Sequence, residues 1–146
     1  MGVDMSARGF ACVGLDNPKS HLNVGSVLRA ARCYDAAMVV TSGQRYRRAV
    51  TDTQAAYRHI PLLNVESLRE AIPFDCVPVA VDLIEGAREL KTYAHPERAF
   101  YIFGPEDGTL GKRITEWCRD IIYIPTTFCM NLAATVNVVL YDRMVK

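Results

Sequence analysis

The chain has 146 residues, of which half are apolar and 23% are charged, and its formal net charge is +1. This size and composition are typical of one compact domain, expected here over residues 1–146, and they exclude a disordered chain. The near-neutral charge argues against a protein that grips nucleic acid over its whole surface, so any RNA contact needs local positive charge or charge shared across an oligomer.

The hydropathy and cysteine patterns exclude several classes of protein. No apolar run approaches the roughly 18 residues of a membrane span, and the N-terminus lacks the apolar stretch of a signal peptide. The five cysteines are scattered without a C-x-x-C pair, which fits neither a zinc site nor a disulfide framework. We expect a cytoplasmic protein without a metal or a membrane contact, in which at least four thiols are buried and reduced.

Apolar runs alternate with helical patterns along the chain. The runs that we predict to be strands span 9–15, 36–41, 76–83, 99–103 and 120–124. The segments that we predict to be helices span 23–34, 66–71, 110–118 and 131–144. Because the predicted strands are apolar throughout, the pattern indicates an α/β domain whose mostly parallel sheet has helices on both faces.

Three local features refine this prediction. Asn23 and Asn131 are suitable N-caps for the first and last helices. Pro78 lies within the third apolar run, and its missing N–H suits an edge strand or a bulge better than a central position. Ligands of open parallel sheets bind beyond the carboxyl ends of the strands, which directs attention to the loops after Leu83, Phe103 and Ile124.

The loop and helix after the first strand contain Asn23, Gly25 and Arg29. Gly25 allows close backbone approach near the helix start. Arg29 is either a solvated surface arginine, which is the commoner case, or a group that binds phosphate or stabilises charge at the carboxyl edge of the sheet. From this segment alone, the surface interpretation is favoured.

Two further loops carry polar residues directly after strands. Glu106 and Asp107 follow the fourth strand, either as solvated turn residues or as acids that hold a cofactor or position an arginine. Cys129 and Asn131 follow the fifth strand. A Cys–His enzyme is disfavoured, because the three histidines lie far from Cys129 in the sequence.

The polar segment 44–58 places basic residues beside aromatic ones. Such a loop suits RNA phosphate contacts and base stacking, although a merely solvated charged loop is an equal alternative. The residues concerned are Arg45, Tyr46, Arg47, Arg48, Tyr57 and Arg58. No dinucleotide-binding, Walker A, zinc-protease or nucleophile-elbow motif accompanies them.

Taken in order, three motifs resemble those of the SpoU-type SPOUT RNA methyltransferases. They are Asn23-x-Gly25-x-x-x-Arg29, then Phe103-Gly104-Pro105-Glu106, then Ile124-Pro125 followed by Met130-Asn131-Leu132. The resemblance spans residues 23–141, and the chain is most similar to minimal members that methylate a ribose 2′-hydroxyl, among them enzymes of the tRNA wobble position. It implies an α/β knot fold with a C-terminal trefoil knot, S-adenosyl-L-methionine (SAM) as cofactor and S-adenosyl-L-homocysteine as product. It also implies RNA as substrate, with tRNA as the first expectation, and a homodimer with active sites completed across the interface.

The resemblance also assigns roles to residues. Arg29 matches the catalytic arginine, with Asn23, Glu106 and Asn131 as catalytic or positioning partners. The expected SAM-binding loops contribute Asp82, Leu83, Gly86, Gly104, Ile124, Pro125, Cys129 and Met130. Arg45, Arg47, Arg48 and Arg58 are the expected RNA contacts.

Two departures from the family pattern keep alternatives open. Cys129 and Ala133 stand where serine is common in relatives. They leave room for an inactive RNA-binding protein of the same fold, which we rank second to the ribose methyltransferase. A SPOUT enzyme that methylates a base nitrogen ranks below the ribose enzyme because its motifs differ, and a thiol enzyme unrelated to SAM ranks last.

Overall fold

The computed structural model describes residues 9–45 and 59–146. The strands are β1 (Phe10–Leu15), β2 (Val39–Ser42), β3 (Leu62–Val65), β4 (Val77–Val81), β5 (Arg88–Glu89), β6 (Arg98–Phe103) and β7 (Asp120–Tyr123). The helices are α1 (His21–Cys33), α3 (Lys112–Thr115) and α4 (Leu132–Val145), with 3₁₀ turns η3 (Leu68–Ala71) and η4 (Leu90–Thr92).

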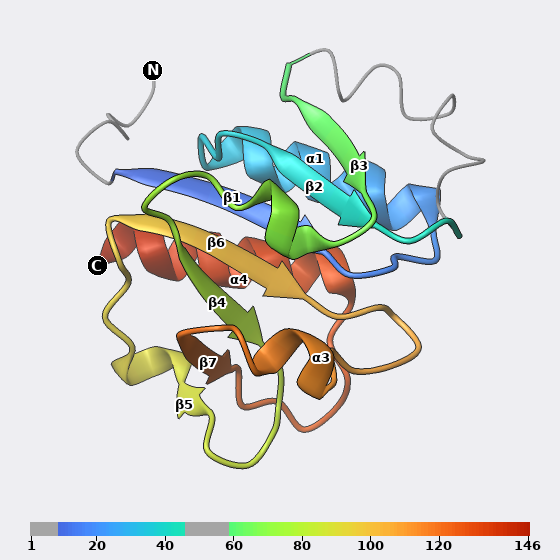
Figure 1. Ribbon diagram of the computed structural model, residues 1–146. Helices are drawn as coiled ribbons and strands as arrows, with labels where there is room; N and C mark the ends of the chain where they lie inside the picture. Colours follow the sequence, from blue (N-terminus) through green and yellow to red (C-terminus); the bar gives the residue numbers. More distant parts are fainter. Residues whose placement is uncertain (1–8, 46–58) are drawn as a thin grey trace.

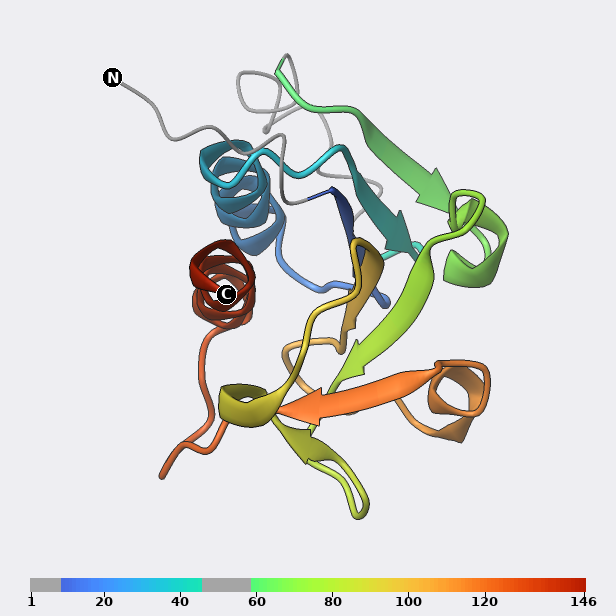
Figure 2. The ribbon, with the colours of Figure 1, turned by 90° about the vertical axis from the view of Figure 1, so that its left-hand side faces the viewer.

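Within the described residues, seven strands form one sheet in the order β3-β2-β1-β6-β4-β7-β5 (Figure 1). Every neighbouring pair is parallel. Figure 2 shows α1 and α4 side by side on one face of the sheet, with η3 and α3 on the other. The predicted parallel α/β sheet with both faces covered is therefore confirmed, whereas the trefoil knot stays a prediction.

The burial of the strands follows from these two layers. Val13 and Tyr101 belong to the core cluster that includes the buried residues of α1 and α4. Cys12 and Phe100, the adjacent residues of the same two strands, belong to the cluster that contains Leu68 of η3 and residues of α3. Because successive side chains of a strand point to opposite faces, a strand covered on both faces must be apolar at every position.

The N-cap of α1 is a residue that the sequence prediction misplaced. Ser20 caps the helix, and its Oγ accepts a hydrogen bond from the backbone N–H of Asn23 at 3.3 Å. Asn23 is thus inside the first turn, which frees its side chain for contacts elsewhere. The last helix begins as predicted, because Asn131 Oδ1 accepts from the backbone N–H groups of Ala133 and Ala134.

Pro78 lies in an interior strand and not at an edge, since β4 pairs with β6 on one side and with β7 on the other. Its carbonyl accepts from the N–H of Arg119 on the β7 side. The N and C=O of one extended residue point the same way. The position of the missing N–H therefore faces β7 before that strand begins, because the pairing of β4 with β7 starts at Val79 and Asp120. No hydrogen bond between these two strands is lost at Pro78.

Three other elements differ from the prediction. The edge strand β3 has partly exposed residues and lacks a buried apolar run, and β5 has two residues, so neither carries a clear sequence signal. The third predicted helix shrinks to the four residues of α3. Gly111 immediately before it has φ +71°, a left-handed conformation that cannot belong to the helix.

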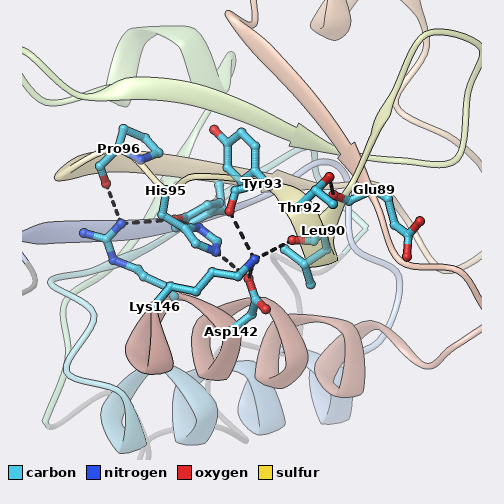
Figure 3. A network of polar contacts seen from close by, with 10 residues as sticks. Glu89, Leu90, Thr92, Tyr93, His95, Pro96, Asp142 and Lys146 are labelled. Carbon is cyan, nitrogen blue, oxygen red and sulfur yellow. Dashed lines mark hydrogen bonds and ion pairs between the residues drawn. The ribbon is translucent and has the colours of Figure 1, made fainter.

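A partly buried polar network holds the C-terminal end of α4 (Figure 3). His95 lies between the Tyr101 hydroxyl and the Asp142 carboxylate, each at 2.7 Å. Arg143 donates to the carbonyls of residues 96 and 97, and Lys146 donates to those of residues 90 and 93. The network joins the end of α4 to the segment between η4 and β6.

His95 makes this connection sensitive to acid. Its side chain is 1% exposed, and burial lowers its pKa below the ordinary 6.5, against the opposing hydrogen bond to Asp142. The unfolded chain therefore binds more protons at mildly acidic pH, so the free energy of unfolding falls as the pH drops below that value. We expect His95→Gln to remove part of the stability loss between about pH 7.5 and about pH 5.5, measured by urea unfolding. The substitution His21→Gln is the control, and an equal pH dependence in wild type and His95→Gln would contradict the prediction.

Candidate functional site

A cavity of about 440 Å³ opens at the carboxyl ends of β4, β6 and β7. The sequence analysis expected a ligand site at this edge of the sheet, in the loops after Leu83, Phe103 and Ile124. The cavity has a size typical of small-molecule sites. Its lining comprises Val81, Asp82, Leu83, Phe103, Gly104, Pro105, Glu106, Gly108, Tyr123, Ile124, Thr126, Thr127, Phe128, Cys129, Met130, Leu132 and Thr135.

Most of the predicted cofactor residues lie in this lining, and two do not. The lining includes Asp82, Leu83, Gly104, Ile124, Cys129 and Met130. Gly86 lies beyond it in the turn before β5, and Pro125 sits between two residues that line the cavity. Phe128, which is 85% exposed in the β7–α4 loop, also lines the cavity and lies within the expected loop from Ile124 to Met130, although it was not singled out as a cofactor residue.

Two backbone features shape the cavity wall. A Cβ on Gly104 would lie 3.3 Å from the Leu110 nitrogen, which is tighter than ordinary packing allows. Asp82 Oδ2 accepts a hydrogen bond from that same Leu110 N–H at 3.1 Å. The loops after β4 and β6 are thus held close together where they line the cavity.

Glu106, Asn23 and Asn131 form one hydrogen-bonded chain, although 83 and 108 residues separate the bonded pairs. Asn23 Nδ2 donates to Glu106 Oε2 at 2.9 Å, and Asn131 Nδ2 donates to Asn23 Oδ1 at 3.2 Å. Asn23 therefore uses its donor toward one motif and its acceptor toward another. The structure brings the three predicted motifs together at the side of the cavity that Glu106 lines.

The carboxylate of Glu106 also sits at the start of α1. Its two oxygens accept from the backbone N–H groups of Lys19 and Ser20, each at 2.9 Å. Partial burial works to raise the pKa of Glu106, but the hydrogen bonds from Lys19, Asn23 and Ser20 outweigh it and lower the pKa below its ordinary value. Glu106 is therefore ionised at neutral pH and acts as an acceptor, not as an acid.

Arg29 is the predicted catalytic residue that the fold does not bring to this group. It is exposed on α1 and is not among the residues lining the cavity of its own chain. Along α1, the exposed residues Leu22, Ser26 and Cys33 lie at the spacing that places them on the same side as Arg29. Arg29 thus projects from a helix surface, two turns away from Asn23.

Arg45 is the one predicted RNA contact that falls within the described residues, since Arg47, Arg48 and Arg58 lie outside them. Its guanidinium donates to both carboxylate oxygens of Asp107, at 2.8 and 3.1 Å. The hydrogen bond from Arg45 lowers the pKa of Asp107, and Asp107 in turn raises that of Arg45.

Sequence reasoning missed a second arginine near the strand ends. Asp16 is buried at the end of β1, where its two carboxylate oxygens accept from Arg113 Nη2 at 2.6 Å and from Ser42 Oγ at 3.1 Å. Asp16 belongs to none of the three family motifs, so the sequence did not indicate that it would pair with Arg113. The pair anchors α3 to the β1 end of the sheet.

The cysteines are more exposed than predicted. Cys12 and Cys76 are buried, and burial followed by the proximity of Cys76 raises the pKa of Cys12 to about 12. Cys33 and Cys129 are exposed, the first because it ends α1 on its outer side. Among the described residues, the cavity lining that includes Cys129 holds no histidine.

Residues 9–45 and 59–146 contain neither a candidate metal cluster nor a membrane-spanning helix. No three His, Cys, Asp or Glu side chains in these ranges are grouped so that they could hold a metal ion. No helix in these ranges has both the length and the apolar character needed to cross a bilayer.

Comparisons with known proteins match this sequence and this fold. The model of the SpoU rRNA Methylase family matches residues 11–141. A protein named "Uncharacterized tRNA/rRNA methyltransferase" from Archaeoglobus fulgidus is 27% identical over 138 residues, which cover 87% of this chain and 61% of that protein. The chain therefore spans less than two thirds of the length of this relative.

Two solved structures illustrate the likeness of fold. The SpoU methyltransferase AviRb from Streptomyces viridochromogenes, in complex with the cofactor AdoMet, has a TM-score of 0.79 at 21% identity, over 93% of this chain and 57% of that one. A structure described as "Structural insights into the 2-OH methylation of C/U34 on tRNA" has a TM-score of 0.76 at 20% identity, over 93% of this chain and 95% of that one. Because the family model covers most of the sequence, this chain belongs to the SpoU rRNA methylase family.

Proposed function

We propose that this protein is a SAM-dependent RNA methyltransferase that transfers a methyl group to a ribose 2′-hydroxyl. The observation that carries the proposal is the hydrogen-bonded chain of Glu106, Asn23 and Asn131 beside the cavity. It unites polar residues from three separate segments, the first turn of α1, the β6–α3 loop and the start of α4, at the edge where parallel sheets bind ligands. Family membership and the AdoMet complex of a structural neighbour support the choice of cofactor.

The cavity fits SAM in size and in wall chemistry. A volume of about 440 Å³ suits a ligand of this size, and among the described residues that line it Asp82 and Glu106 are the charged ones. Gly104 lets the backbone of Leu110 pack close behind this part of the wall, where a Cβ would lie 3.3 Å from the Leu110 nitrogen. The loops around Asp82, Gly104 and Ile124 to Met130 would hold the cofactor, which supplies an activated methyl group when bound.

The protein's own groups then act on the ribose hydroxyl. A guanidinium is always charged at neutral pH, so Arg29 cannot serve as a simple general base. We assign to it the orientation of the hydroxyl and stabilisation of the negative charge that develops on its oxygen, in concert with an RNA phosphate. Glu106, Asn23 and Asn131 hold the substrate side of the cavity in shape.

We further propose a homodimer in which Arg29 completes the cavity of the partner subunit. This accounts for an exposed catalytic arginine that does not line the cavity of its own chain. Helix α4 lies next to α1, and its exposed apolar residues support a surface that the partner subunit covers. Val138, Tyr141 and Val145 are 38%, 52% and 56% exposed and lie at helical spacing on one side of α4.

A charged residue within this surface tests the dimer. Tyr141→Glu should yield monomers in analytical ultracentrifugation and should reduce methyl transfer strongly, because each cavity loses the partner's Arg29. Leu63→Glu, at a 45% exposed apolar residue of β3, is the control and should stay dimeric and active. A dimeric Tyr141→Glu variant, or an active monomer, would contradict this arrangement.

The proposed substrate is tRNA, with the wobble position as the first candidate, and the proposed compartment is the cytoplasm. The structure described by methylation of C/U34 on tRNA matches this chain over 95% of its own length, which supports tRNA as the substrate. A domain of this size suits a compact RNA element such as an anticodon stem-loop.

Gly104 offers a direct test of the SAM site. The substitution Gly104→Val places branched carbons in the cavity wall, where even a Cβ would press on the Leu110 nitrogen. We expect the Kd for SAM to rise by about tenfold or more, measured by calorimetry. Leu63→Val is the control, since Leu63 is an exposed residue of β3 that does not line the cavity. Unchanged SAM affinity in Gly104→Val would place the cofactor elsewhere.

The deciding experiment is incubation of the purified protein with labelled SAM and total tRNA from a strain lacking the gene, followed by digestion to nucleosides. A labelled 2′-O-methylated nucleoside would support the proposal and identify the base. A base-methylated nucleoside would refute the ribose assignment. Label absent from tRNA but present in ribosomal RNA would refute only the tRNA assignment. Failure to bind SAM would favour the inactive RNA-binding protein.

A further inference from the structure

Arg45 and Asp107 are joined more completely than surface ion pairs usually are. Arg45 Nη1 and Nη2 donate to the two oxygens of Asp107 at 2.8 and 3.1 Å. Arg45 Nη2 also donates to the carbonyl of Asn17 at 2.6 Å. Both hydrogens of Nη2 are therefore engaged, and a phosphate could bind this fork only by displacing a charge-assisted, bidentate partner.

The pair connects three loops that follow three different strands. Asn17 follows β1, Arg45 follows β2, and Asp107 follows β6. Asn17 is tied to the end of β2 a second time, because its N–H donates to Ser42 Oγ at 3.2 Å. Ser42 and Arg45 are thus tied to the segments after β1 and β6, two strands that lie on the same side of β2 in the sheet.

Asp107 is also the residue next to Glu106. Glu106 holds the backbone N–H groups of Lys19 and Ser20 and the side chain of Asn23, and it lines the cavity. Two successive carboxylates therefore anchor the β6–α3 loop in different directions, one to the start of α1 and one to Arg45. Among the side-chain contacts of residues 9–45 and 59–146, release of Asp107 would leave those of Glu106 to anchor this part of the loop.

The exposure of the pair argues against a role in stability. The side chains of Arg45 and Asp107 are 35% and 49% exposed, and exposed ion pairs contribute little to the free energy of folding. An ordered, bidentate contact that adds little stability is well suited to fixing geometry.

We propose that Arg45 and Asp107 form a clamp that positions the Glu106 loop for cofactor binding and methyl transfer. This inference rests on the proposed function, and it makes Arg45 a positioning residue in place of the RNA phosphate contact expected from the sequence. The two roles differ in what they require. A clamp needs the forked geometry of arginine, whereas a phosphate contact chiefly needs the positive charge.

The test compares Arg45→Lys, Asp107→Ala and the double variant. Arg45→Lys keeps the charge but loses the fork. We expect each single variant to raise the SAM KM and lower kcat, by roughly tenfold in kcat/KM, and the double variant to be no worse than either. RNA affinity of Arg45→Lys and its dependence on salt should match those of the wild type. Amide hydrogen exchange of Lys19 and Ser20 should accelerate in all three variants, because their acceptor Glu106 is less firmly held.

The opposite results would overturn the clamp. If Asp107→Ala binds RNA several-fold more tightly while SAM kinetics and the exchange of Lys19 and Ser20 stay unchanged, Arg45 is a phosphate contact that Asp107 restrains. Arg119→Lys is the control, since Arg119 pairs with Asp120 at the opposite edge of the sheet and should leave every measurement unchanged. If the wild type transfers no methyl group, the proposed function fails, and the exchange rates of Lys19 and Ser20 still decide for or against the clamp.

Discussion

Arg29→Ala should reduce methyl transfer by about 10²- to 10³-fold while leaving folding and SAM binding intact. This is the loss expected when a group that stabilises developing negative charge is removed. Arg29 is exposed on α1 and does not line the cavity of its own chain, so its truncation disturbs neither the core nor the SAM site. The measurements are single-turnover methylation, SAM calorimetry and thermal unfolding of the same preparations.

A neighbouring arginine provides the matched control for this prediction. Arg32 is also exposed on α1, and Arg32→Ala removes the same charge from the same helix. It should retain most of the wild-type rate if the effect belongs to Arg29 and not to net charge. A normal rate in Arg29→Ala would refute the proposed mechanism, and equal losses in both variants would point to general electrostatic attraction of RNA.

Asn23→Asp should nearly abolish activity at neutral pH and restore part of it in mild acid. The change is isosteric, but it places a second carboxylate against Glu106 where the wild type has an N–H donor at 2.9 Å. Two carboxylates in contact repel, and one of them takes up a proton with a raised pKa. We expect a loss of roughly 10²-fold near neutrality, because the Glu106 loop is displaced from the cavity.

The expected pH dependence of stability follows from the direction in which the wild-type fold shifts the pKa of Glu106. The pKa of Glu106 is lowered in the folded protein, so its interactions stabilise the fold above the ordinary carboxyl range and are lost as the pH falls through that lowered pKa. In Asn23→Asp the pH dependence has the opposite sign, because a falling pH protonates one of the two carboxylates and relieves their repulsion. Thermal unfolding and methylation rates at about pH 5.5 and about pH 7.5 measure this directly.

A second variant separates repulsion from simple disruption. Adding Glu106→Gln to Asn23→Asp exchanges the amide and the carboxylate, so the hydrogen bond can form in the reverse direction. The double variant should be more active than Asn23→Asp at neutral pH, although one of the two oxygens that accept from Lys19 and Ser20 is lost. If the single variant shows no pH dependence and the double variant no gain, the link between Asn23 and Glu106 does not govern the site.

Local sequence patterns determined most of the layered fold. Strands β1 and β6 are apolar at successive positions because both of their faces are covered, and the buried side of α1 shows helical spacing. Asn131 was recognised as an N-cap because a cap acts within three residues. Order along the chain also placed the candidate ligand loops correctly, since parallel strands present their carboxyl ends at one edge.

Interactions between distant segments decided what the patterns could not. Pro78 lies in an interior strand because the β7 pairing begins one residue later, and β3 and β5 are strands because neighbouring strands pair with them. Ser20 caps α1, which leaves Asn23 free to bind both Glu106 and Asn131.

The same distinction holds for the site. The sequence by itself determined which loops carry polar residues and which family the motifs resemble. Only the tertiary structure decided that Glu106 is an ionised acceptor, that Arg45 is held by Asp107, and that Arg29 does not line the cavity of its own chain. Hydrogen bonds and ion pairs depend on distance and direction in space, and residues far apart in the sequence acquire both only when the sheet brings their loops to one edge.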